Sequence, residues 1–297
     1  MRIDSAQLAA FAAVIREGSF ERAARTLHVT RSAVSQRVKQ LEERVGQVLV
    51  RRGAPCAPTE AGQGLFRHAH QMSQLETEAL ATLRGAGIAG AAVSVAVNAD
   101  SLATWFIDAL APLARDHGLA FDVLVEDQDH SSDLLRQGRV MAAVTSDPHA
   151  VQGCRAVRLG AMRYRAVASP EFVRKFFPGG VDATSLAAAP MLVFNRKDGL
   201  QGRFARRYTR RAVAAPVHWL PSPQGFVDAA LAGMGWGMNP EALVRRHLEE
   251  GVLLDLARQE PIDVVLYWQH WRLEIRALGF LTDSVLRVAG GALQAPR

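Results

Sequence analysis

The chain has 297 residues, 49% of them hydrophobic and 22% charged, which is typical of a folded globular protein and excludes a disordered or collagen-like chain. No apolar run approaches the ~20 residues of a membrane-spanning helix, and the N-terminus lacks the features of a signal peptide. The two cysteines, Cys56 and Cys154, are too isolated to predict a disulfide framework or a zinc site. We therefore expect a cytoplasmic protein of two or three domains, without membrane contact, metal or cofactor.

The formal net charge of +6 is concentrated near the N-terminus. Residues 1–60 hold ten Lys and Arg against six Asp and Glu, an excess of +4, whereas the rest of the chain holds 25 against 23, an excess of +2. Positive charge gathered in one short segment is typical of a module that binds nucleic-acid phosphates.

Apolar residues recur at helical spacing three times within the first 45 residues. The three sets are Leu8, Phe11, Ala12 and Ile15; Phe20, Ala23, Ala24 and Leu27; and Val34, Val38, Leu41 and Val45. Ser19 and Thr30 are suited to cap the second and third helices, and Gly18 and Gly46 to end the first and third. The short connection between the last two helices is typical of a helix-turn-helix, whose recognition helix enters the major groove.

The polar side of the predicted recognition helix carries our candidates for contacts with DNA bases and phosphates. These are Arg31, Ser32, Ser35, Gln36, Arg37 and Lys39. Beyond the helix, Val48–Val50 and two nearby prolines indicate a short two-stranded wing, which places Arg51 and Arg52 near the DNA backbone. Any solvated helix could carry such charges, so the prediction of a winged helix-turn-helix at residues 1–58 depends on the complete three-helix pattern.

Residues 59–90 are predicted to form a linker, with a helix capped by Thr59 that ends near Arg84 and a glycine-rich hinge over residues 85–90. The helix carries an apolar stripe, formed by Leu65, Ala69, Met72, Leu75, Ala79, Leu80 and Leu83 and interrupted by Glu76. A helix of this length between two domains favours packing against the same helix of a second subunit. The alternative is that it lies on its own C-terminal domain.

From Val93 onward, short apolar strands alternate with helical segments, which predicts an α/β domain with parallel strands. The expected strands are 93–97, 121–125, 140–144, 166–168, 191–194, 235–238 and 264–268. The length of residues 91–297 suits two lobes, one of about 91–163 with 267–297 and the other of about 164–266. Because ligands bind at the carboxyl ends of strands, we expect a small-molecule site in a cleft lined by residues 98–101, 145–147 and 222–224.

Several motifs resemble those of LysR-type transcription regulators. In the N-terminal part these are Gly18-Ser19-Phe20, Ala23-Ala24, Ser32-Ala33-Val34-Ser35-Gln36 and Thr59-Glu60-Ala61-Gly62. The C-terminal run from Val97 to Trp105 resembles the ArgP/LysG branch, which responds to lysine and arginine and controls a basic-amino-acid exporter. The wing departs from the family pattern, because residues 53–58 lack its usual further basic residue and leucine.

The resemblance implies a homodimer or homotetramer with a winged helix-turn-helix, a long linker helix that dimerises, and a two-lobed domain like that of periplasmic binding proteins. It also implies that lysine or arginine is the effector. Our candidates for its site are Asp100, Ser101, Leu102, Thr104, Trp105, Glu126, Asp127, Thr145, Asp147, Phe194 and Ser222. Carboxylates at strand ends are as often solvated or capping groups, so the choice among them, and Asp198, stays open.

The remaining motifs set limits on the function. A cluster of arginines, Arg203, Arg206, Arg207, Arg210 and Arg211, either contacts DNA or RNA polymerase or is a solvated face. No metal-binding or catalytic motif is present, so we do not expect an enzyme. The prediction is a sequence-specific regulator controlled by a small effector. The alternative is an architectural or replication-origin DNA-binding protein whose C-terminal domain oligomerises.

Overall fold

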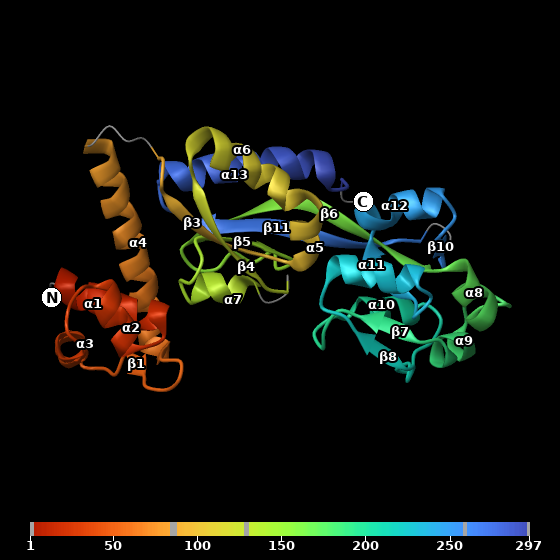
Figure 1. The fold of residues 1–297 in the computed structure, drawn as a ribbon, viewed down its shortest axis with the longest axis horizontal. Coiled ribbons are helices and arrows are strands. Elements are labelled where there is room, and N and C mark those ends of the chain that lie inside the picture. The colour runs from red at the N-terminus through yellow and green to blue at the C-terminus, as the bar shows by residue number, and fades with distance from the viewer. Residues whose placement is uncertain (1–2, 84–87, 128–130, 258–259, 296–297) are drawn as a thin grey trace.

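The computed structural model describes residues 3–83, 88–127, 131–257 and 260–295. A small helical domain stands at one end of an elongated molecule, the long helix α4 rises from it, and a two-lobed domain occupies the rest (Figure 1). One core of buried side chains runs through both lobes, and a separate core fills the N-terminal domain. Within the described ranges, no helix is long and apolar enough to cross a membrane.

The N-terminal domain contains the three predicted helices, α1 (Ser5–Glu17), α2 (Phe20–Thr26) and α3 (Arg31–Val45). Ser19 and Thr30 cap α2 and α3 as expected, because their hydroxyl oxygens accept backbone N–H groups of the first helical turn. Gly18 and Gly46 end α1 and α3 at positive φ, a conformation that favours glycine. Local sequence signals therefore determine the boundaries of this domain's helices.

The wing consists of β1 (Val50–Arg51) paired antiparallel with β2 (Ala57–Pro58). Its position relative to α3 is set by Glu42, whose Oε1 accepts the backbone N–H of Leu49 at 2.8 Å and of Val50 at 3.1 Å. The recognition helix and the wing are thus connected by direct hydrogen bonds.

The linker helix α4 (Glu60–Leu83) presents two different faces. One face lies on the chain's own C-terminal domain, where Arg67 donates to the Gln152 carbonyl at 3.0 Å, His70 contacts the Gly138 carbonyl, and Glu78 pairs with Arg276. The expected alternative of packing on its own C-terminal domain therefore holds for this face. Much of the predicted apolar stripe stays exposed, including Met72, Leu75, Leu80 and Leu83. Residues 85–87 of the predicted hinge lie outside the described residues.

The two-lobed domain is built on a seven-stranded sheet in the order β10-β6-β11-β5-β3-β4, with β9 also paired to β6. The strands are β3 (Ala92–Val97), β4 (Ala120–Val125), β5 (Ala142–Thr145), β6 (Cys154–Ala168), β9 (Gly237–Pro240), β10 (Leu254–Asp255) and β11 (Ile262–Trp271). β3 is parallel to β4 and β5, whereas β11 is antiparallel to β5 and β6. The prediction of parallel strands was wrong for this part of the sheet.

Helices cover both faces of the sheet in the lobe next to the linker (Figure 1). α5 (Ala99–Ser101) continues through a π-helical turn (Leu102–Phe106) into α6 (Ile107–His117), which lies with α13 (Arg276–Ala292) on one face, while α7 (Ser131–Arg136) lies on the other. The second lobe adds a parallel pair, β7 (Met191–Val193) and β8 (Val217–Trp219). Its helices are α8 (Pro170–Phe176), α9 (Ala183–Ala188), α10 (Leu200–Ala205), α11 (Pro223–Leu231) and α12 (Glu241–Glu249).

The long strands β6 and β11 pass from one lobe into the other (Figure 1). Sequence patterns predicted only residues 166–168 of β6, because arginines and Gly160 interrupt its apolar alternation. Two of its four arginines are paired within the fold, Arg163 with Asp263 of β11 and Arg165 with Glu241 and Asp255, whereas Arg155 and Arg158 are exposed. The two connecting strands thus hold the lobes on either side of a cleft.

Candidate functional site

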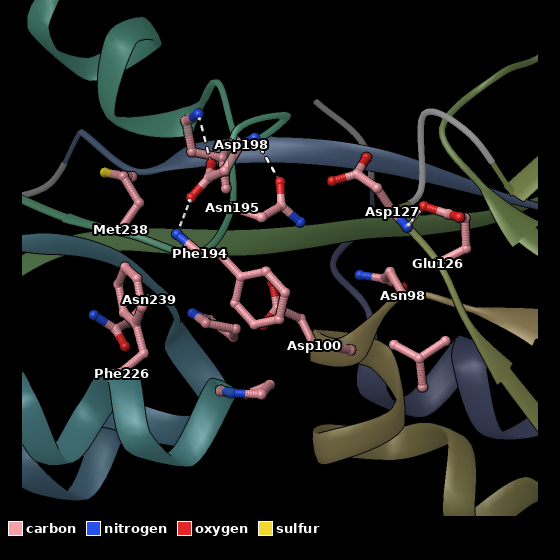
Figure 2. Close-up of a pocket in the computed structure, with 15 residues that line it drawn as sticks. Asn98, Asp100, Glu126, Asp127, Phe194, Asn195, Asp198, Phe226, Met238 and Asn239 are labelled. Atoms are coloured by element: carbon pink, nitrogen blue, oxygen red, sulfur yellow. Dashed lines mark hydrogen bonds between the residues drawn. The ribbon is translucent and has the colours of Figure 1, made fainter. Parts of the chain in front are cut away.

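A cavity of about 140 Å³ lies between the two lobes. One wall comes from the carboxyl ends of β3 and β4, and the other from the loop after β7, the start of α11 and the end of β9 (Figure 2). The lining residues are Asn98, Ala99, Asp100, Val125, Glu126, Asp127, Phe194, Asn195, Asp198, Leu200, Pro223, Phe226, Met238, Asn239 and Pro240. The set combines acidic, amide and apolar side chains, which suits a small polar ligand with an apolar stem.

Four carboxylates line this cavity, and no lysine or arginine is among the described residues of its lining. Asp100, Glu126 and Asp127 follow strands of the first lobe, and Asp198 belongs to the second (Figure 2). The two oxygens of Asp198 accept the backbone N–H groups of Phe194 and Leu200, both at 3.0 Å. Asp198 therefore fixes the conformation of its own loop and adds negative charge to the second-lobe wall. The other three carboxylates supply the negative charge of the first-lobe wall.

Apolar side chains form another part of the lining. The Phe194 ring lies in the middle of the view of the site, and Phe226 and Met238 lie on the side of the second lobe (Figure 2). Gly237 packs tightly against Phe226, since a Cβ at this position would stand 2.5 Å from the ring. The close approach fixes the Phe226 ring at the wall of the cavity.

Several buried polar atoms at or near the cavity have no hydrogen-bond partner among the described residues. They include both side-chain atoms of Asn98 and the Oδ1 atom of Asn239, two residues that line the cavity. Asn98 is 3% exposed and Asn239 is fully buried. Buried amides without partners are costly to a protein, so their presence at the cavity indicates a place for ligand or water polar groups.

The carboxylate of Asp100 is enclosed by its neighbours and accepts a hydrogen bond from the Tyr164 hydroxyl. Burial raises the pKa of Asp100 to about 6, an effect opposed by the Tyr164 hydrogen bond and reinforced by the charges of Asp198 and Asp127. A positive group in the cavity would relieve this repulsion. The site is therefore electrostatically suited to a cation.

The N-terminal domain presents the second candidate surface. On α3 the side chains of Val34, Val38 and Leu41 are buried. Exposed on the same helix are Arg31, Ser32, Gln36 and Lys39, with Ser35 and Arg37 partly buried among them. On the wing, Arg51 and Arg52 are exposed, and the Arg52 guanidinium lies 5.3 Å from the centre of the Phe20 ring. The arrangement gives the module a polar, basic side next to the wing.

Two family models match the chain. Residues 5–63 match the bacterial regulatory helix-turn-helix protein of the lysR family, and residues 86–289 match the LysR substrate-binding domain. The chain belongs to the LysR family. Its predicted fold class is thereby confirmed, and so is its role as a DNA-binding transcription regulator.

Relatives place this LysR-type regulator near the ArgP and LysG proteins, as the sequence motifs predicted. It is 47% identical to the regulator LysG of Mycobacterium tuberculosis over 98% of this chain and 95% of that one. The crystal structure of ArgP from the same organism matches with a TM-score of 0.90 at 47% identity, covering 99% and 100% of the chains. Full-length LysG of Corynebacterium glutamicum with bound effector Arg matches with a TM-score of 0.81 at 41% identity, covering 98% and 99%.

The structure of the regulator brings only some of the predicted effector residues together. Asp100, Glu126, Asp127 and Phe194 line the cavity. Ser222 precedes the lining residue Pro223, and its hydroxyl oxygen accepts the Gly225 N–H as the cap of α11. Those outside the lining are Ser101, Leu102, Thr104, Trp105, Thr145 and Asp147. Thr104 and Trp105 instead border a different cavity beside the C-terminal residues 291–294.

The loop that carries Asp147 borders an adjoining cavity through Ser146 and Pro148, and its backbone is bound by β11. Gln269 donates to the carbonyls of Asp147 and His149, at 3.0 and 2.9 Å. Sequence reasoning also missed Asn195, Phe226, Met238 and Asn239 as lining residues. Met238 and Asn239 lie on β9, whose antiparallel pairing with β6 leaves no local signal, and Phe226 lies on α11. Asn195 follows the predicted strand at 191–194 and Asn98 stood in a predicted strand-end loop, so both were detectable.

Proposed function

We propose that this regulator binds L-arginine or L-lysine in the cavity between its lobes. Binding then changes how the regulator acts at its operators, one of which controls the gene of a basic-amino-acid exporter. The observation that carries the proposal is the set of four carboxylates around a cavity without a lysine or arginine among its described lining residues. Its relative LysG from Corynebacterium glutamicum, solved with bound effector Arg, supports the same ligand class.

The cavity offers a partner for each part of a basic amino acid. The cationic end would pair with Glu126 and Asp127, since charge-assisted hydrogen bonds to carboxylates are the strongest available here. The apolar stem would lie along Phe194 and Phe226, and the polar α-groups would meet the unpartnered amide of Asn98. A ligand that contacts both lobes stabilises the relative position of the lobes in which both walls of the cavity reach it. Binding can thereby shift the regulator from a state without these contacts to one that has them.

For the DNA side, we propose that α3 enters the major groove. Arg31, Ser32, Ser35, Gln36, Arg37 and Lys39 would contact bases and phosphates, and Arg51 and Arg52 the backbone beside the wing. Support comes from their position on one side of the helix-turn-helix module that the family model matches. The exposed apolar stripe of α4 supports a homodimer, from which a tetramer could be built.

Calorimetric titration of the full-length protein tests the effector. L-arginine and L-lysine should bind, and citrulline, which lacks the charged guanidinium, should bind at least tenfold more weakly. Asp127→Asn should weaken arginine binding, whereas Asp122→Asn, an exposed carboxylate on β4, the strand that Asp127 follows, should leave it unchanged. Equal affinity for arginine and citrulline would contradict recognition through the carboxylates.

Operator binding is tested separately with DNA from the control region of a basic-amino-acid exporter gene. Fluorescence anisotropy should show that arginine or lysine changes the affinity or the footprint at a fixed salt concentration. A footprint that is identical with and without both amino acids would favour an architectural role instead.

A further inference from the structure

Lys197 lies at the edge of the cleft on a loop whose shape is fixed by its own side chains. Asn195 Oδ1 accepts the backbone N–H of Lys197 at 2.7 Å and that of Asp198 at 3.1 Å. Asp198 in turn accepts the N–H groups of Phe194 and Leu200. The loop therefore holds the base of the Lys197 side chain in a defined position on the second lobe.

The ammonium group of Lys197 reaches across to the first lobe. Its Nζ atom donates to Glu126 Oε1 at 3.0 Å, the same oxygen that accepts the Asp127 N–H. Glu126 lines the cavity described above, while Lys197 lines an adjoining cavity of about 440 Å³ that shares Asp127, Asp198 and Leu200 with it. The ion pair thus stands where the two cavities of one cleft meet.

A lysine at position 197 pairs with a carboxylate differently from an arginine. Only three of the chain's 35 basic residues are lysines, and the other two, Lys39 and Lys175, lie outside the residues that line either cavity. An ammonium is a compact charge on a flexible stem, whereas a guanidinium would hold a carboxylate through two parallel hydrogen bonds. A lysine here can give up Glu126 more readily than an arginine could.

We propose that Lys197 is a tethered competitor of the effector: its ammonium neutralises Glu126 in the empty site and must leave it, or share it, when a cationic amino acid enters. The inference rests on the proposed function, because it assumes that a basic amino acid binds beside Glu126. It assigns Lys197 the role of setting the effector concentration at which the regulator responds.

The size of the effect follows from the exposure of the pair. The Lys197 and Glu126 side chains are 47% and 34% exposed, and ion pairs of such exposure are weak. Replacing the ammonium by a neutral side chain of similar length should therefore tighten effector binding by about two- to fivefold. Replacement by arginine should do the opposite, because a bidentate partner competes better for the carboxylate.

The experiment is calorimetric titration of the full-length protein with L-arginine and with L-lysine. Lys197→Met should bind both more tightly than the wild type, and Lys197→Arg more weakly, while Lys175→Met, on α8 of the same lobe, should match the wild type. In the Glu126→Gln background the Lys197→Met change should have no further effect, because the competing ion pair is already absent.

The outcomes separate the two proposals. If the wild type binds neither amino acid, the proposed function fails. If the wild type binds them but Lys197→Met leaves the affinity unchanged, the competitor role alone is overturned. Weaker binding by Lys197→Met also overturns it, since Lys197 would then hold the lobes together or bind the effector's carboxylate.

Discussion

The hydroxyl of Tyr164 donates a 2.7 Å hydrogen bond to the carboxylate of Asp100 at the wall of the cleft. Because burial and the nearby carboxylates raise the pKa of Asp100 from 3.8 to about 6, the native protein holds a proton between these pH values that the unfolded chain has released. Asp100 therefore contributes less to the free energy of unfolding as the pH rises through this window. A bound cation would favour the ionised carboxylate and partly reverse that loss.

Effector binding should weaken in acid for the same reason. Arginine keeps its charge between pH 5 and 7.5, so below about pH 6 its binding must displace the proton from Asp100. We expect arginine to bind about tenfold more weakly at pH 5 than at pH 7.5, as measured by calorimetry. In Asp100→Asn the pH dependence should largely disappear. A wild-type affinity that is constant over this pH range would show that arginine binding is not coupled to the protonation of Asp100.

The recognition helix should govern operator affinity. Replacing both Ser35 and Gln36 by alanine removes polar groups on the groove side of α3 without touching its buried face, and lost base contacts cost ~1–3 kcal/mol each. We expect specific operator binding to fall at least tenfold by fluorescence anisotropy, with non-specific binding little changed. Gln47→Ala, exposed just beyond the helix, is the matched control. Unchanged operator affinity in the double variant would contradict this orientation of the helix.

Much of the N-terminal domain was predictable because its signals are local. Helix caps such as Ser19 and Thr30 act within three residues, and apolar spacing identified the buried face of α3. The role of Glu42 was not predictable, since its hydrogen bonds to the wing at Leu49 and Val50 depend on the fold of the segment between them. The same limit hid most of β6, where Arg163 and Arg165 are paired with carboxylates 76 to 100 residues away in the sequence.

For the cleft, the prediction of lining residues succeeded where the order and direction of the strands alone determine a residue's position. Asp100 and Glu126 follow parallel strands that end at one edge, so both were expected there and both line the cavity. The loop with Asp147 follows β5 at the same edge, but it borders the adjoining cavity through Ser146 and Pro148, and Gln269 of β11 binds its backbone there. Asn239 lies on β9, whose antiparallel pairing with β6 could not be inferred from the sequence pattern.

Gly62 should be irreplaceable at the junction of wing and linker helix. A Cβ at this position would collide with the carbonyl oxygen of Leu49, a backbone atom that cannot rotate away. We expect Gly62→Ala to destabilise the N-terminal domain by about 1–3 kcal/mol, seen as a lower melting temperature by circular dichroism. Gly64→Ala is the control, since nothing lies within 4 Å of its added methyl group and alanine favours a helix. Equal losses in both variants would refute a steric role for Gly62.

The exposed stripe of α4 should join two copies of the chain. Leu80 and Leu83 are 52% and 83% exposed, while the opposite face of α4 is occupied by contacts such as the Glu78–Arg276 ion pair with the chain's own domain. Burying both leucines against a second α4 would contribute a few kcal/mol, at ~1.5–3 kcal/mol for each fully buried side chain. Introducing glutamate at both positions should therefore shift the mass measured by light scattering toward the monomer, and Thr77→Glu, exposed beside the stripe, should not. If the double variant keeps the wild-type mass, the subunits meet through another surface, and the contacts of α4 with its own domain are its main packing.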